Sequence, residues 1–190
     1  MRRIFFWLLA SLCIHAETID KIMAVVDGHI ITLGDARQER NIRLILGDNS
    51  IDDEALVQQL IESYLIETQL VGFPGIDVDE EEVAAELAKL SGKDGVTANA
   101  LREAVHRRIR TARYLDVRFR QFLRPSEENV GKYYEEVFAP QARARGITLV
   151  PPLDQVADTV GRNVIEEQLD HEVTVWLEAV RRRSDIEILN

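Results

Sequence analysis

The sequence has very little cysteine. Its 190 residues include one, Cys13, which lies in an apolar segment close to the N-terminus. If that segment is removed, the remaining chain has no thiol and therefore no disulfide, no cysteine-ligated zinc site and no cysteine nucleophile. The stability of such a chain must come from packing, and several classes of enzyme are excluded.

Catalytic patterns are also scarce. The three histidines after residue 16, His29, His106 and His171, are far apart and lack the spacing of metal ligands. There is no G-x-S-x-G motif, P-loop or dinucleotide fingerprint, and ten glycines and five prolines are too few for a collagen-like or low-complexity chain. The acidic run from Asp77 to Glu86 lacks the spacing of a calcium loop and is typical of a solvated helix start. We therefore predict no metal, no cofactor and no catalytic residue.

The sequence has fewer basic than acidic residues, and it has no apolar run long enough to span a bilayer. The 23 basic and 33 acidic side chains give a formal charge of -10, which disfavours nucleic acid as a partner. The run from Ile4 to Ile14 follows two arginines and ends before Ala16, which predicts a signal peptide at residues 1–16. A lipoprotein anchored through Cys13 is the less favoured alternative, because Leu12 stands where a small residue is normally needed. Cleavage removes two arginines, which leaves 21 basic and 33 acidic residues, a charge of -12 and no stable membrane insertion.

The spacing of apolar residues predicts a mainly α fold of about six helices with a small N-terminal β-hairpin. Two β-branched runs flank Asp27-Gly28, a pair favoured in tight hairpin turns. Helix signals follow over residues 32–46, 52–72, 79–90, 97–124, 126–138 and 153–180. A lone strand at Ile186–Ile188 needs partners, so we expect it to join the hairpin and bring the chain ends together.

The pattern that begins at Thr97 is read as the longest helix, and it is rich in arginine. On a regular helix five of its arginines fall within an arc of about 80° beside the apolar stripe: Arg102, Arg110, Arg113, Arg120 and Arg124. Intramolecular pairing with the acidic helix is the favoured interpretation of this basic edge. A charged rim on a binding groove, with Arg113 and Arg120 at the rim, is the alternative.

Aromatic residues gather around Pro125 in the sequence. They are Tyr114, Phe119, Phe122, Tyr133 and Tyr134. Core packing accounts for most of them, but a cleft that receives side chains of another polypeptide has the same composition. We name these five as the candidate lining of such a cleft.

In the order of its elements the sequence resembles the SurA family of periplasmic chaperones and peptidyl-prolyl isomerases. The resemblance is carried by residues 19–28, Ile30-Ile31-Thr32 and Asp35 at the start, by Leu60-Ile61-Glu62 and Leu65-Ile66, by Val130 with Tyr133-Tyr134, and by the tail from Val156 through Trp176-Leu177 to residues 186–189. It implies a single chaperone core at 17–190 in which the C-terminal helix and strand complete the N-terminal part.

The chain departs from that family where the parvulin isomerase domain is expected. Only twelve residues separate Phe138 from Pro151, and a folded domain needs roughly 50 or more. We therefore expect an N-terminal part at 17–138, a loop at 139–152 in place of the isomerase domain, and a C-terminal helix and strand at 153–190. No catalytic residue is carried over.

The resemblance implies a periplasmic, ATP-independent holdase that binds unfolded exported or outer-membrane polypeptides. The alternatives are a prolyl isomerase, by family association alone, and a structural or assembly protein that forms a homodimer or docks onto an envelope partner.

Overall fold

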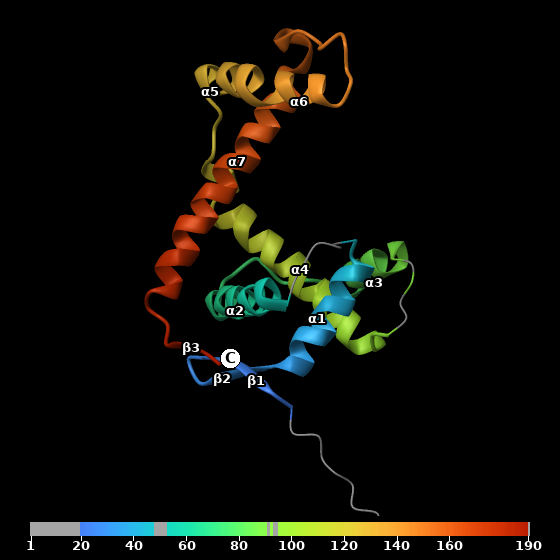
Figure 1. The fold of residues 1–190 in the computed structure, drawn as a ribbon, viewed down its shortest axis with the longest axis vertical. Coiled ribbons are helices and arrows are strands. Elements are labelled where there is room, and N and C mark those ends of the chain that lie inside the picture. The colour runs from blue at the N-terminus through green and yellow to red at the C-terminus, as the bar shows by residue number, and fades with distance from the viewer. Residues whose placement is uncertain (1–19, 48–52, 91, 93–94, 190) are drawn as a thin grey trace, which may run out of the picture.

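The computed structural model describes residues 20–47, 53–90, 92 and 95–189, and the signal peptide predicted at residues 1–16 lies outside them. The fold is mainly α, as the sequence predicts, with one small sheet (Figure 1). None of the described helices is long and apolar enough to cross a membrane. The elements in chain order are β1 (Ile22–Val26), β2 (His29–Thr32), α1 (Leu33–Ile45), α2 (Asp53–Leu70), α3 (Glu80–Lys89), α4 (Ala98–Arg118), η1 (Arg120–Phe122), α5 (Glu127–Tyr133), η2 (Tyr134–Phe138), α6 (Ala139–Ala144), α7 (Leu153–Arg181) and β3 (Ile186–Ile188).

The sheet joins the two ends of the described chain. Its order is β2-β1-β3, with β1 antiparallel to both neighbours, so the predicted return of the C-terminal strand to the hairpin is confirmed. Asp27 and Gly28 both have positive φ, of 50° and 82°, as the tight turn requires. The Asp27 amide donates to the carbonyl of Asp185, and the Asp185 amide donates to the Asp27 carboxylate, each at 2.8 Å. The hairpin turn therefore also anchors the start of β3.

The core consists of two apolar clusters that meet at Trp176 of α7. The first lies between the sheet, α2 and α7, and its buried members include Val26, Ile61 and Val180. The second contains Leu70, Ile76 and Tyr114, which come from α2, the loop after it and α4. The partly buried indole of Trp176 packs against both clusters. One side chain of α7 therefore couples the sheet side of the core to α4.

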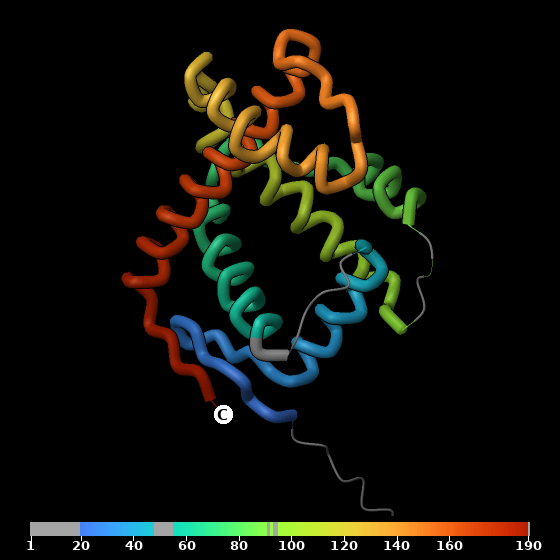
Figure 2. Tube along the Cα trace, turned by 45° about the horizontal axis from the view of Figure 1, so that its top comes forward, coloured from blue at the N-terminus to red at the C-terminus, as the bar shows by residue number. Residues whose placement is uncertain are grey.

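The segment after α4 forms a separate lobe on the N-terminal half of α7. Figures 1 and 2 show α5 and α6 at the end of α7 that lies away from the sheet. The elements α5, η2 and α6 follow one another without a break, so the loop expected at 139–152 begins only at Arg145. Pro140 is the second residue of α6, which directly follows the π-helical turn η2. A proline ring clashes with the carbonyl four residues earlier in a regular helix, and the wider π turn relieves that clash.

The helix that starts at Thr97 is shorter than the sequence suggests. It ends at Arg118, where Phe119 leaves helical geometry with φ -124° and ψ -62°. The longest described helix is instead α7, with 29 residues against 21 in α4. Arg120 and Arg124 lie beyond the end of α4, so the regular 100° spacing used to place them on one arc does not apply to them.

Replacing Trp176 by alanine should destabilise the whole fold, because it removes the side chain shared by both core clusters. We expect a loss of about 3 kcal/mol in the free energy of unfolding, at the lower end for large aromatic side chains because the indole is only partly buried. Val175→Ala is the matched control, because Val175 is half-exposed on the same helix, and it should cost about 0.5 kcal/mol or less. Urea denaturation followed by circular dichroism measures both changes, and equal losses would contradict the role given to Trp176.

Candidate functional site

The arginines of the predicted basic edge pair within the chain. Arg102 pairs with Glu80 and Arg113 with Glu82, which are both in α3, and Arg113 also donates to the Asp77 carbonyl. Arg110 donates to the Leu70 carbonyl at 3.0 Å, and Arg124 donates to the carbonyls of Gln121 and Leu123. The interpretation of intramolecular pairing with the acidic helix is therefore confirmed for Arg102 and Arg113. Arg113 lies at the α3–α4 contact and not at the rim of a groove.

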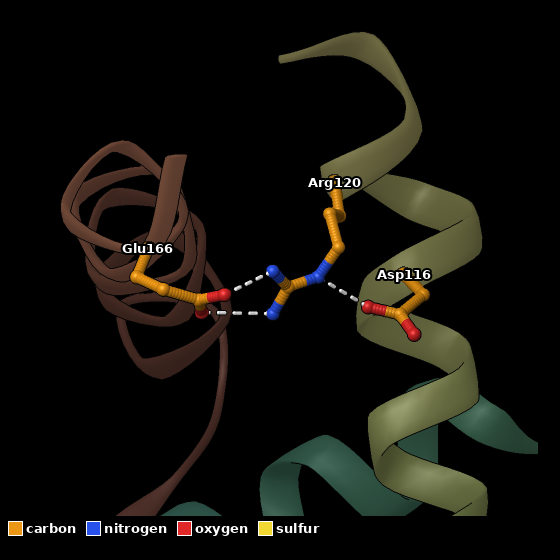
Figure 3. Close-up of polar contacts among 3 residues, drawn as sticks. All are labelled: Asp116, Arg120 and Glu166. Atoms are coloured by element: carbon orange, nitrogen blue, oxygen red, sulfur yellow. Dashed lines mark hydrogen bonds and ion pairs between the residues drawn. The ribbon is translucent and has the colours of Figure 1, made fainter. Parts of the chain in front are cut away.

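Arg120 holds the end of α4 against α7. Figure 3 shows its guanidinium between two carboxylates: one edge faces Glu166 of α7, and the Nε atom donates to Asp116 at 2.6 Å. Both Glu166 oxygens accept, with 2.9 Å from Nη2 to Oε2, and such a bidentate pair fixes the orientation of both side chains. The hydrogen bonds that Arg120 donates to Glu166 lower the pKa of the Glu166 carboxyl, and the same bonds raise the pKa of Arg120. Phe122 follows Arg120 by two residues, so this pair positions the start of the lobe.

Two of the candidate aromatic residues belong to the core. Tyr114 is 2% exposed, its pKa is raised by burial, and its ring centroid lies 5.7 Å from that of Trp176. Phe119 meets the same indole edge-on at 5.6 Å. The Arg118 guanidinium lies within 6 Å of all three ring centroids, a cation–π arrangement that covers this cluster. Tyr114 is therefore not available to line an open cleft, and Phe119 packs against the core.

Tyr134 has a structural contact of its own. Its hydroxyl donates to the Pro151 carbonyl at 2.8 Å, and its ring stacks on Phe138 with centroids 5.8 Å apart. These contacts tie the π turn to the loop that enters α7. Tyr134 is not among the residues that line the cavity formed by the remaining two aromatic candidates.

Phe122 and Tyr133 do line one cavity, which we call the distal groove. Its volume is about 720 Å³, and it lies between α7 and the chain from η1 to η2. Phe122 is 72% exposed there, whereas Tyr133 is half-buried. The full lining comprises Phe122, Leu123, Arg124, Asn129, Lys132, Tyr133, Glu136, Val137, Val164, Glu167, Gln168, His171 and Glu172. The structure thus brings two of the five aromatic candidates together in a solvent-accessible groove.

The groove has the chemistry of a binding surface. Leu123, Val137 and Val164 add aliphatic surface to the two aromatic rings, while Lys132 and Glu167 represent charges of both signs on opposite walls. None of the buried side chains in the described part of the chain is charged, and no group of three or more His, Cys, Asp or Glu there could hold a metal ion. The groove offers apolar contact and charged edges.

The wall of the groove on α7 was not identified from the sequence. Val164, Gln168 and His171 lie at three- and four-residue steps and so share a face of that helix. Val164 contributes to the apolar spacing that predicts the helix at 153–180, whereas His171 does not. No sequence signal shows that this part of the stripe faces a groove, because that depends on which segment covers it.

The Arg120–Glu166 pair gives a prediction for the pH dependence of stability. Because the pKa of Glu166 is lowered in the folded state, its stabilising effect is complete above the ordinary value of 4.5 and is lost as the pH falls below that value and through the lowered one. Glu166→Gln should cost about 0.5–1 kcal/mol at pH 7, a small value because both side chains are substantially exposed. Urea titrations at pH 7 and at pH 2 measure it, and a cost that is the same at both pH values would contradict the assignment. Glu167→Gln, at the next position of the same helix, is the control.

Comparisons with protein-family models and with curated proteins find no match to this chain. The resemblance drawn from the sequence therefore stays a prediction.

Proposed function

We propose that the protein is an ATP-independent holdase that binds unfolded polypeptides in the distal groove. The observation that carries this proposal is the exposure of Phe122 beside Tyr133 in a groove with aliphatic surface and charged edges. A large aromatic side chain left 72% exposed is costly to hydrate and gains free energy when it is covered by another apolar group. A groove of this composition favours apolar and aromatic segments of an unfolded chain.

Binding of this kind needs no nucleotide. A client segment enters the groove, covers the ring of Phe122 and excludes water from Leu123 and Val137, while flanking polar groups of the client remain at the charged edges. Each contact is weak, so the client exchanges rapidly. Binding lowers the concentration of free unfolded chain and thereby slows its aggregation.

The proposed clients and the proposed compartment are inferred from the sequence. A predicted signal peptide and the resemblance to SurA-type chaperones support a periplasmic protein whose clients are exported or outer-membrane polypeptides. The return of β3 to β1 agrees with what that resemblance implies for the C-terminal strand. These points support the proposal, and the groove makes it specific to named residues.

Removing the exposed aromatic ring tests the proposal. Phe122→Ser should raise the protein concentration needed for half-maximal suppression of client aggregation about tenfold, the factor that corresponds to a loss of about 1.4 kcal/mol in binding free energy. Tyr133→Ala should act in the same direction. Light scattering during dilution of an unfolded outer-membrane protein from urea gives the measurement.

The matched control for Phe122→Ser is Leu149→Ser. Leu149 is 88% exposed in the loop before α7 and does not line the groove, so its replacement removes exposed apolar surface elsewhere and should leave suppression unchanged. Equal effects of the two substitutions would show that general surface hydrophobicity, and not the groove, binds the client. Unaltered suppression by folded Phe122→Ser would refute the site.

The isomerase alternative is tested separately. Eight residues, Arg145–Pro152, connect α6 and α7, which is too short for the folded domain that such an activity needs in the family. We expect the protein at substoichiometric concentration to leave the rate of a proline-limited refolding reaction unchanged. Acceleration that persists after the protein is purified to homogeneity would overturn the holdase proposal in favour of an enzyme.

A further inference from the structure

A second cavity lies on the other side of the fold, between β2, α1, α2 and α4. Its volume is about 460 Å³, and we call it the proximal cleft. Figures 1 and 2 show α1, α2 and α4 in the half of the fold that contains the sheet. Two strongly exposed aliphatic side chains line the cleft, Ile30 of β2 at 49% and Val71 after α2 at 78%. The proximal cleft shares no lining residue with the distal groove.

The charge of the proximal cleft is unbalanced, although Glu67 and Glu103 also line an adjoining cavity to which Arg102 and Arg110 contribute. Four carboxylates line it and only one guanidinium, that of Arg107, which pairs with Glu39 at 3.5 Å. Glu67 and Glu103 are exposed and form no hydrogen bond or ion pair with the described part of the chain. Two carboxylates without a partner beside exposed aliphatic side chains complement a ligand that is both basic and apolar.

The edge of a strand runs along this cleft. His29, Ile30 and Ile31 are consecutive in β2, and all three line it. Neighbouring strand residues point to opposite faces of a sheet, so a cavity that meets three in succession follows the edge of the strand. Among the described strands β2 pairs only with β1, and the Thr32 amide at the end of β2 donates to the Asp35 carboxylate. The part of the outer edge that is left to exchange hydrogen bonds with an added strand therefore lies at Ile30.

We infer that the proximal cleft binds an extended polypeptide segment in which Lys or Arg alternates with aliphatic residues. The segment adds to the outer edge of β2, its apolar side chains cover Ile30 and Val71, and its basic side chains face Glu67 and Glu103. This site is independent of the distal groove, and peptide binding to it can be measured whether or not the protein suppresses aggregation.

The experiment uses two fluorescein-labelled peptides of nine residues and fluorescence anisotropy. One peptide alternates Lys with Val, and the other carries Glu in place of every Lys. The Lys peptide should bind at least tenfold more tightly than the Glu peptide.

The double variant Glu67→Gln/Glu103→Gln, which breaks no ion pair in the described structure, should weaken binding of the Lys peptide about threefold to tenfold. The double variant Asp158→Asn/Asp170→Asn on α7 is the control, because these exposed residues line neither the proximal cleft nor the distal groove; it removes the same net charge and should leave the affinity within about 1.5-fold.

Backbone methylation tests the strand edge. Two N-methylated forms of the Lys peptide are compared, one methylated at the odd-numbered residues and one at the even-numbered residues. Each form lacks the N–H donors on one edge of the extended peptide. The form that lacks the donors facing β2 should not bind, and the other should bind as the unmodified peptide does. Equal affinity for the Lys and Glu peptides, or equal effects of the two double variants, would refute the proximal cleft as the site. Equal binding of both methylated peptides would refute strand addition.

Discussion

The indole of Trp176 lies where the two apolar clusters of the core meet, and the position of the other elements depends on that contact. On one side it packs with residues of the sheet and α2, and on the other with Tyr114 and Phe119 at the end of α4. The β3 strand that follows α7 pairs with β1 and fixes the C-terminal end of the same helix. With one end held in this way, the 29-residue helix extends beyond the core and carries the lobe formed by α5, η2 and α6.

The distal groove follows from the weaker packing of that lobe. The residues buried between the lobe and α7 are small: Ala139 and Ala142 of α6, and Val160 and Val164 of α7. The core beside the sheet contains leucines and isoleucines. Small side chains bury little apolar area and leave the larger rings without cover. The bidentate pair between Arg120 and Glu166 nevertheless holds this part of the chain against α7. An apolar surface that is held in place and left uncovered is suited to weak, reversible binding.

The sequence predicted those features that depend on local patterns. The Asp27-Gly28 turn and the pairing of Ile186–Ile188 with the hairpin appear as expected, and a capping box of Thr32 and Asp35 starts the first helix where the sequence predicts it. It failed where geometry is set by tertiary contacts: the apolar spacing after Thr97 continues past Arg118, although the backbone leaves the helix at Phe119. Pro140 suggested a loop because a π turn that accommodates proline has no recognisable sequence signal. Of the five aromatic candidates, composition could not distinguish the buried Tyr114 from the exposed Phe122, because burial depends on whether Trp176 lies opposite.

Hydrogen exchange of the protein with and without a bound client tests the central claim most directly, because it locates the binding surface without any substitution. Mass spectrometry of the complex with an unfolded outer-membrane protein should show slower exchange at 120–137 and at 160–172, the two walls of the distal groove, with unchanged exchange in α3. Protection should disappear when the client is released. A client that binds stably and protects neither wall would contradict the account.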